Sequence, residues 1–179
     1  MTTKWKKYRR LMAALGVQDQ HAVAIDQKST LDPLSIVTEY GAHEITSKLQ
    51  QSNLITIMSL AVAINADPTA KGDYTSTLLL KSSPNAYGET DINTLYIQHQ
   101  TNKDDKDVKG PLNLGYTIED KDKKPKAVVL ASSTFVTEQQ QGGIHTAGNR
   151  DFALNSIGWL TGQKDTITIR PRNEAAIRP

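Results

Sequence analysis

The segment GNRDFALNSIGWLTGQKDTITIRPR (148–172) contains the signals of a helix followed by a short strand. Asn149 can accept hydrogen bonds from the free amides of a first helical turn, and Asp151 places negative charge at the positive end of the helix dipole. Gly162 supplies the stop signal. We therefore predict a helix over 149–161 that is buried over much of its circumference. Its apolar residues recur at helical spacing and widen into a broad stripe: Phe152, Ala153, Leu154, Ile157, Trp159 and Leu160.

The residues after this helix predict a terminal strand. Between Thr166 and Ile169, β-branched polar and apolar residues alternate. Pro171 then ends the pattern, because proline lacks the N–H that a ladder needs. A helix with a broad apolar stripe must pack on a sheet, so we expect the chain to close with this helix and a half-exposed edge strand at 166–169.

Apolar periodicity predicts the remaining elements. Helical spacing is found at 3–15 and from about Glu44 to Leu49. The most hydrophobic strand pattern, AVVLASSTFV (127–136), is placed in the middle of the sheet, since such strands are buried on both faces. Charged or polar segments at 26–33, 101–109 and 119–126 are expected to be turns and surface loops. The other strand patterns lie at 21–26, around Ile36 and Val37, at 53–67 as one or two strands, and at 74–83 and 110–119.

Helices and strands that mix without internal repeats predict an α/β fold with a mixed, largely parallel sheet flanked by helices. The sheet is expected to be mixed because the strands at 110–119 and 127–136 are close enough in sequence to pair as a hairpin. We expect one domain over 1–179. Its core is expected to be built by strands 21–26, 74–80 and 127–136, with helix 149–161 packed across them.

Composition excludes several classes of protein. The 179 residues are 37% apolar and 22% charged, which is ordinary for a soluble globular chain. The absence of cysteine excludes disulfide scaffolds, cysteine-based zinc sites and thiol nucleophiles. No apolar run approaches the roughly eighteen residues of a transmembrane helix. The formal net charge is +2. Five cations lie in the first ten residues, so the rest of the chain carries −3. These cations are Lys4, Lys6, Lys7, Arg9 and Arg10. No basic stripe interleaved with aromatic residues follows them, so we expect no nucleic-acid binding.

The sequence contains no recognisable catalytic or metal-binding motif. Its four histidines, at 21, 43, 99 and 145, lack the spacing of metal ligands. His43 beside Glu44 is the most suggestive, but polar residues are common where helices begin. The acidic pairs at 104–105 and 119–120 lie within lysine-bearing runs, which makes a raised carboxyl pKa unexpected. We therefore assign no catalytic, cofactor-binding or metal-ligating residue and expect no cofactor.

One position is singled out for ligand binding. Ser132, Ser133 and Thr134 follow the strand that we place at the centre of the sheet. In open α/β sheets, ligands bind at the carboxyl ends of the strands, where backbone amides and hydroxyls can contact a small polar molecule. Serines that cap a loop are equally common at such places, so both interpretations stay open.

Five sequence blocks, taken in order, resemble the extracytoplasmic domain of ABC-type transport auxiliary proteins of the gliding-motility-associated kind. The resemblance runs from about residue 20 to residue 172. The last block is the most specific, with an Asn-Arg-Asp entry, an Asn-x-x-x-Trp-Leu helix and an Ile-Arg-Pro exit. The blocks are LDPLSIVTEYGAHEIT, LLLKSSPNAYGETD, DVKGPLNLGYTIE, KAVVLASSTFV and GNRDFALNSIGWLTGQKDTITIRPR.

The resemblance implies a fold similar to class I glutamine amidotransferases and flavodoxin-like domains, without the cysteine nucleophile. It implies a non-enzymatic binding or scaffolding domain of an ABC-type transport system, with gliding motility as the candidate process. The implied partners are membrane components of the transporter, with self-association as a further candidate. The implied location is the extracytoplasmic, periplasmic side of the inner membrane of a bacterium. We expect this chain to be part of a larger protein, anchored by membrane segments outside it.

Two other functions stay open. The first is a small-molecule or sugar-binding domain, or an enzyme, on the same amidotransferase-like fold, with its pocket at the end of the strand at 127–136. The second is an intracellular regulatory module.

Overall fold

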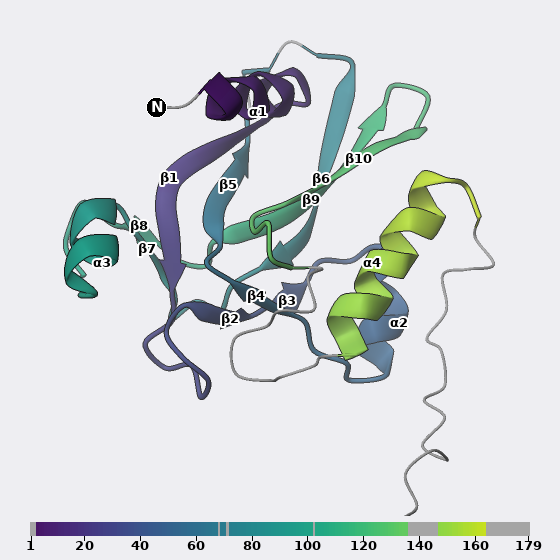
Figure 1. Ribbon diagram of the computed structural model, residues 1–179. Coiled ribbons are helices and arrows are strands. Elements are labelled where there is room, and N and C mark those ends of the chain that lie inside the picture. The colour runs from purple at the N-terminus through teal and green to yellow at the C-terminus, as the bar shows by residue number, and fades with distance from the viewer. Residues whose placement is uncertain (1–2, 68, 71, 102, 136–146, 164–179) are drawn as a thin grey trace, which may run out of the picture.

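The computed structural model describes residues 3–67, 69, 70, 72–101, 103–135 and 147–163 (Figure 1). None of the described helices has the length and apolar content that crossing a bilayer requires. The elements, in chain order, are α1 (Thr3–Ala14), β1 (Val17–Ile25), β2 (Ser35–Val37), β3 (Glu39–Tyr40), α2 (Glu44–Gln51), β4 (Ile57–Ser59), β5 (Val62–Ala66), β6 (Tyr74–Lys81), β7 (Tyr87–Glu89), α3 (Ile92–Gln98), β8 (Val108–Lys109), β9 (Asn113–Asp120), β10 (Pro125–Leu130) and α4 (Ala147–Leu160).

All strand pairs among the described residues are antiparallel. One four-stranded sheet has the order β5-β1-β7-β8 and a second the order β10-β9-β6-β3, while β2 and β4 form a two-stranded ribbon. The expected α/β fold with a largely parallel, flavodoxin-like sheet is therefore wrong. In Figure 1, α2 and α4 lie together on one side of the molecule, α3 lies beside β7 and β8, and α1 lies at the end where β1 begins.

Short connections explain the antiparallel pairing. At the turn between β9 and β10, the Asp120 N–H donates to the Lys124 carbonyl at 3.0 Å, and the Lys123 N–H donates to the Asp120 carbonyl at 2.9 Å. Parallel neighbours would need a crossover of about a dozen residues or more, far longer than this turn. The hairpin expected between 110–119 and 127–136 is confirmed, as β9 paired with β10.

β10 lies at an edge of its sheet. Among the described residues it pairs with β9 alone, and it ends at Leu130. The placement of 127–136 in the middle of the sheet is therefore wrong. The apolar run Ala127–Leu130 is nevertheless partly buried, because these side chains pack against the main core and α4 lies close to the strand. High apolar content reports burial of side chains, and a packed helix can provide that burial at a sheet edge as well as at its centre.

The other predicted elements are mostly confirmed. The strands expected at 21–26 and 74–83 are β1 and β6, and the segment 53–67 contains two strands, β4 and β5. The helices expected at 3–15 and from Glu44 are α1 and α2. The sequence patterns did not predict β3, β7, α3 or β8. The strand expected at 166–169 lies outside the described residues.

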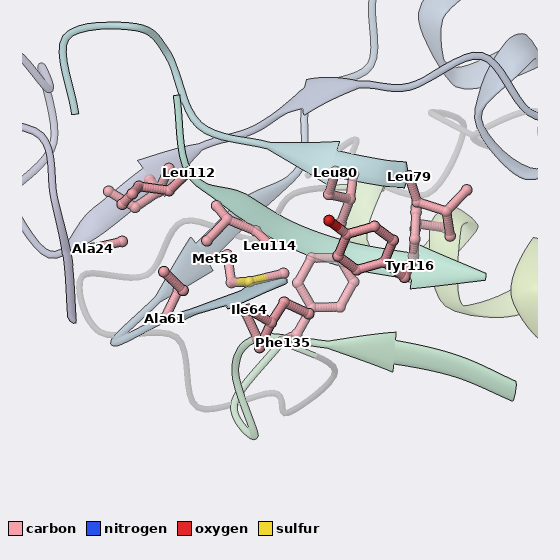
Figure 2. Close-up of a cluster of buried hydrophobic side chains, with 14 of the residues drawn as sticks. Ala24, Met58, Ala61, Ile64, Leu79, Leu80, Leu112, Leu114, Tyr116 and Phe135 are labelled. Carbon is pink, nitrogen blue, oxygen red and sulfur yellow. The ribbon is translucent and has the colours of Figure 1, made fainter. Parts of the chain in front are cut away.

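The main core lies between the two sheets and the α2–α4 pair. Figure 2 shows side chains of β5, β6 and β9 meeting those of Met58 and Phe135. Met58 and Leu114 are 0% exposed, and Phe135 is 2% exposed. A smaller second cluster, beneath α3, contains Val23, Ile25, Tyr87 and Leu95.

The helix predicted at 149–161 is α4, but its buried face differs from the predicted stripe. Phe152 and Trp159 are buried, whereas Ile157 is 56% exposed. The end at Gly162 is confirmed: its φ is +71°, and the Gln163 N–H donates to the Gly158 carbonyl at 2.9 Å. Because α4 begins at Ala147, Asn149 lies inside the first turn, and the expectation that it begins the helix is wrong.

Candidate functional site

Ser132, Ser133 and Thr134 form the turn that follows β10. Ser132 Oγ donates to the Ser59 carbonyl at 2.6 Å and accepts from the Thr134 N–H at 3.2 Å. The Thr134 hydroxyl lies 3.4 Å from the same carbonyl. These two hydroxyls therefore hold the turn against the end of β4. Because the sheet is antiparallel, no row of strand carboxyl ends meets here, and the physical reason for expecting a ligand at this turn no longer applies.

The histidines lie apart from one another. His21 is in β1, His43 precedes α2 and His99 follows α3, while His145 lies outside the described residues. Within the described ranges, no group of three or more His, Asp or Glu side chains is arranged to hold a metal ion.

His43 caps α2 and contacts α4. The Ile45 N–H donates to His43 Nδ1 at 3.2 Å, and the imidazole meets the Trp159 ring edge-on, with 5.2 Å between centroids. Burial lowers the pKa of His43, and the nearby charges of Glu44 and Glu119 oppose this shift. Since Nδ1 can accept only when it is unprotonated, the cap and the burial favour the same neutral form. The interpretation of His43 as a helix-entry residue is confirmed.

We expect acid to destabilise the protein through His43. Its folded pKa lies below the ordinary value of 6.5, so unfolding takes up a proton once the pH falls below that value. The contribution of His43 is therefore complete above about pH 6.5 and is lost as the pH falls toward the folded pKa. In His43→Asn the side chain can still cap α2 but does not titrate. Between about pH 8 and about pH 5, the unfolding temperature of the parent should fall more steeply than that of the variant, and parallel curves would contradict this role.

A groove of about 220 Å³ lies between α1 and β1. In it, Arg9 Nε lies 3.2 Å from Asp19 Oδ2, and His21 Nδ1 lies 2.7 Å from Asp19 Oδ1 and 2.8 Å from Arg9 Nη2. His21 has a φ of +52°, and the Asp19 carboxylate accepts from its backbone N–H at 3.1 Å. Asp19 thus stabilises an irregular stretch of β1 where the register with β5 shifts. The side chains that line this groove offer no hydroxyl or thiol nucleophile.

A second groove, of about 430 Å³, lies between β3 and the end of α2. The Tyr40 hydroxyl donates to the Leu54 carbonyl at 2.7 Å, and burial raises the pKa of this phenol. Lys81 Nζ lies 3.4 Å from Glu39 Oε2 at the rim. The polar groups of this groove are therefore largely used to join β3, β6 and the segment after α2.

Asp104 and Asp120, from the acidic pairs considered in the sequence, and the neighbouring Asp107 serve local structure. The hydrogen bond from the Lys124 amide, followed by that from the Lys126 side chain, lowers the pKa of Asp120. Asp104 accepts from the Lys106 N–H at 2.7 Å, and Asp107 accepts from the Asp104 N–H at 2.8 Å. The expectation of no raised carboxyl pKa is confirmed for Asp120, and the carboxylates of Asp104 and Asp107 stabilise the loop before β8.

The outer side of Ala127–Leu130, called here the β10 edge, is a sheet edge formed by four apolar residues. The Ala131 N–H donates to the Leu114 carbonyl at 2.9 Å, toward β9. Amides alternate in direction along a strand, so those of Ala127 and Val129 also point toward β9, and those of Val128 and Leu130 point away from it. Among the described residues, no strand lies on that outer side.

Edge strands usually carry charges or prolines that prevent pairing with other chains. In β10 such residues stand only at the beginning, as Pro125 and Lys126, and Lys126 Nζ lies 3.0 Å from Asp120 Oδ2. The remaining four residues are apolar. The hydrophobic run that forms this surface was visible in the sequence, but we predicted that it lies at the centre of the sheet.

The chain matches no protein-family model, no curated protein and no solved structure.

Proposed function

We propose that this chain is a non-enzymatic binding or scaffolding domain that takes an extended segment of a partner protein along the β10 edge. The observation that carries this proposal is the position of the most hydrophobic strand at an edge, with outward amides at Val128 and Leu130. A partner strand added there would hydrogen-bond to these groups, and each bond contributes about 0.5–1.5 kcal/mol. Its alternate apolar side chains would pack beside those of Ala127–Leu130, which is how strand addition obtains specificity.

The non-enzymatic character is supported by the uses of the polar side chains. The hydroxyls after β10 hold a turn, Asp107 holds a loop, and Asn149 joins α4 to β4. A catalytic group needs a partner that activates it and space for a substrate. These side chains are instead committed to bonds within the fold.

The proposed partner is a membrane component of an ABC-type transport system on the extracytoplasmic side of the membrane. This part of the proposal rests on the five sequence blocks alone. The flavodoxin-like fold that the same resemblance implied is not found, so the shape of the domain lends it no support.

Val128→Pro should weaken partner binding about tenfold while leaving the fold intact. Proline removes an N–H that points away from β9, so the ladder between β9 and β10 keeps its bonds. With a photo-reactive side chain at position 126, cross-linking to the transporter component should fall about tenfold, the effect of one or two lost hydrogen bonds.

The matched control is Val128→Thr, which keeps the N–H and a similar side-chain volume. It should cross-link like the parent, and both variants should unfold at similar temperatures. Equal yields from the proline and threonine variants would contradict pairing at the β10 edge. Adducts between two copies of the chain would assign the edge to self-association.

A further inference from the structure

α1 gathers the positive charge of the chain into one helix. Its twelve residues include five cations and no acidic residue, whereas the rest of the chain carries −3 out of a net +2. Such a helix repels cations and is attracted to a surface of negative charge.

One face of α1 packs on β1, and the other side is exposed. Arg9 and Met12 lie toward β1, where Arg9 pairs with Asp19. Tyr8 is 56% exposed and Leu11 is 58% exposed. Because residues three apart lie on the same side of a helix, these two apolar side chains form one exposed stripe.

Exposed cations lie on one side of this stripe, away from the face that packs on β1. Lys6, Lys7 and Arg10 are exposed, and no ion pair joins them to another described residue. Lys7 precedes Leu11 by four positions and so lies beside it on the helix. The exposed side of α1 therefore combines apolar side chains with cations at their border. Figure 1 shows α1 at the end of the molecule opposite the β2–β4 ribbon.

We propose that α1 docks this domain on an anionic lipid bilayer. Interfacial helices bind in this way, with apolar side chains among the acyl chains and cations at the headgroups. The combination favours a bilayer over a nucleic acid: phosphates along a duplex would attract the same cations but would gain nothing from Leu11. The inference rests on α1 and is independent of the β10 edge.

Co-sedimentation of the full chain with vesicles tests this docking. The chain should bind phosphatidylcholine vesicles that contain phosphatidylglycerol and should not bind phosphatidylcholine alone. Each cation removed should weaken binding about fivefold, so the triple change Lys6→Gln, Lys7→Gln and Arg10→Gln should weaken it about a hundredfold. The matched control removes the same charge from the β9–β10 turn and should bind within about twofold of the parent; its changes are Lys121→Gln, Lys123→Gln and Lys124→Gln.

Leu11→Ser distinguishes a lipid surface from a nucleic acid. It should weaken vesicle binding about tenfold, because an apolar side chain no longer leaves water. Its unfolding temperature should match that of the parent, since Leu11 is exposed. Equal weakening by the two triple variants, or vesicle binding that does not need phosphatidylglycerol, would overturn the proposal. Binding to a DNA duplex that is unaffected by Leu11→Ser, without binding to vesicles, would also overturn it.

Discussion

Replacing Trp159 with alanine should lower the free energy of unfolding by about 3–5 kcal/mol. The indole is 4% exposed and lies where α4 contacts α2, against the ring of His43. Truncation removes a large apolar surface from the core and leaves a cavity that two helices in contact can close only in part. Chemical denaturation followed by far-ultraviolet circular dichroism measures this loss.

Ile157→Ala is the control for that experiment. Ile157 is in the same helix but is 56% exposed, so its truncation should change the free energy of unfolding by no more than about 0.5 kcal/mol. If Trp159→Ala has an equally small effect, the packing of α4 on α2 described above is incorrect.

Asn149→Ala should lower the free energy of unfolding by about as much, 3–5 kcal/mol, because it breaks the hydrogen bonds that join α4 to β4. Asn149 Oδ1 accepts from the Ile57 N–H at 2.8 Å, and its Nδ2 donates to the Ile57 carbonyl at 2.8 Å and the Phe135 carbonyl at 3.0 Å. The side chain is buried, so alanine leaves three backbone groups without this partner, and each costs about 1–3 kcal/mol. Thermal and chemical unfolding of the variant measure the loss.

Two further variants serve as comparisons for Asn149→Ala. Asn149→Asp keeps the shape of the side chain and the oxygen that accepts from the Ile57 N–H. Its second carboxylate oxygen replaces the amide nitrogen and faces the carbonyls of Ile57 and Phe135. This variant should therefore also lower the free energy of unfolding strongly. Asn93→Ala, at an exposed position of α3, should change the free energy of unfolding by no more than about 0.5 kcal/mol. A small loss from Asn149→Ala would show that the α4–β4 link contributes little.

The helices could be predicted because their signals are local. Trp159 and Phe152 gave the apolar pattern of α4, and Gly162 gave its end. The pattern could not show which apolar residues face the core, and Ile157 is exposed because the buried face turns toward Phe152, Asn155 and Trp159.

α3 was missed although its cap is local: Asp91 accepts from the Thr94 N–H at 3.1 Å. Its seven residues are too few for a clear period.

The sheet order could not be predicted, because strand pairing depends on contacts distant in sequence. The run Ala127–Leu130 was correctly expected to be a strand, but its hydrophobicity indicated burial and not its place in the sheet. The ligand hypothesis for Ser132 depended on a parallel sheet and lost its basis with it. The Arg9–Asp19–His21 cluster was also missed, since it forms only where α1 folds back on β1.

The parallel, flavodoxin-like sheet that the resemblance to transport auxiliary proteins implied is replaced by antiparallel pairs. The helix in its last block, α4, was predicted from its own local signals. The proposed function therefore depends on the open β10 edge.

Amide hydrogen exchange along β10, measured by NMR on the full chain at low concentration, tests that surface most directly. The amides of Val128 and Leu130 point away from β9 and should exchange rapidly. Those of Ala127 and Val129 point into the β9–β10 ladder and should be protected, as core strands are. This alternation is the result that an open edge predicts. Uniform protection of all four amides would show that the β10 edge is already occupied in the free chain, and would contradict the proposed binding surface.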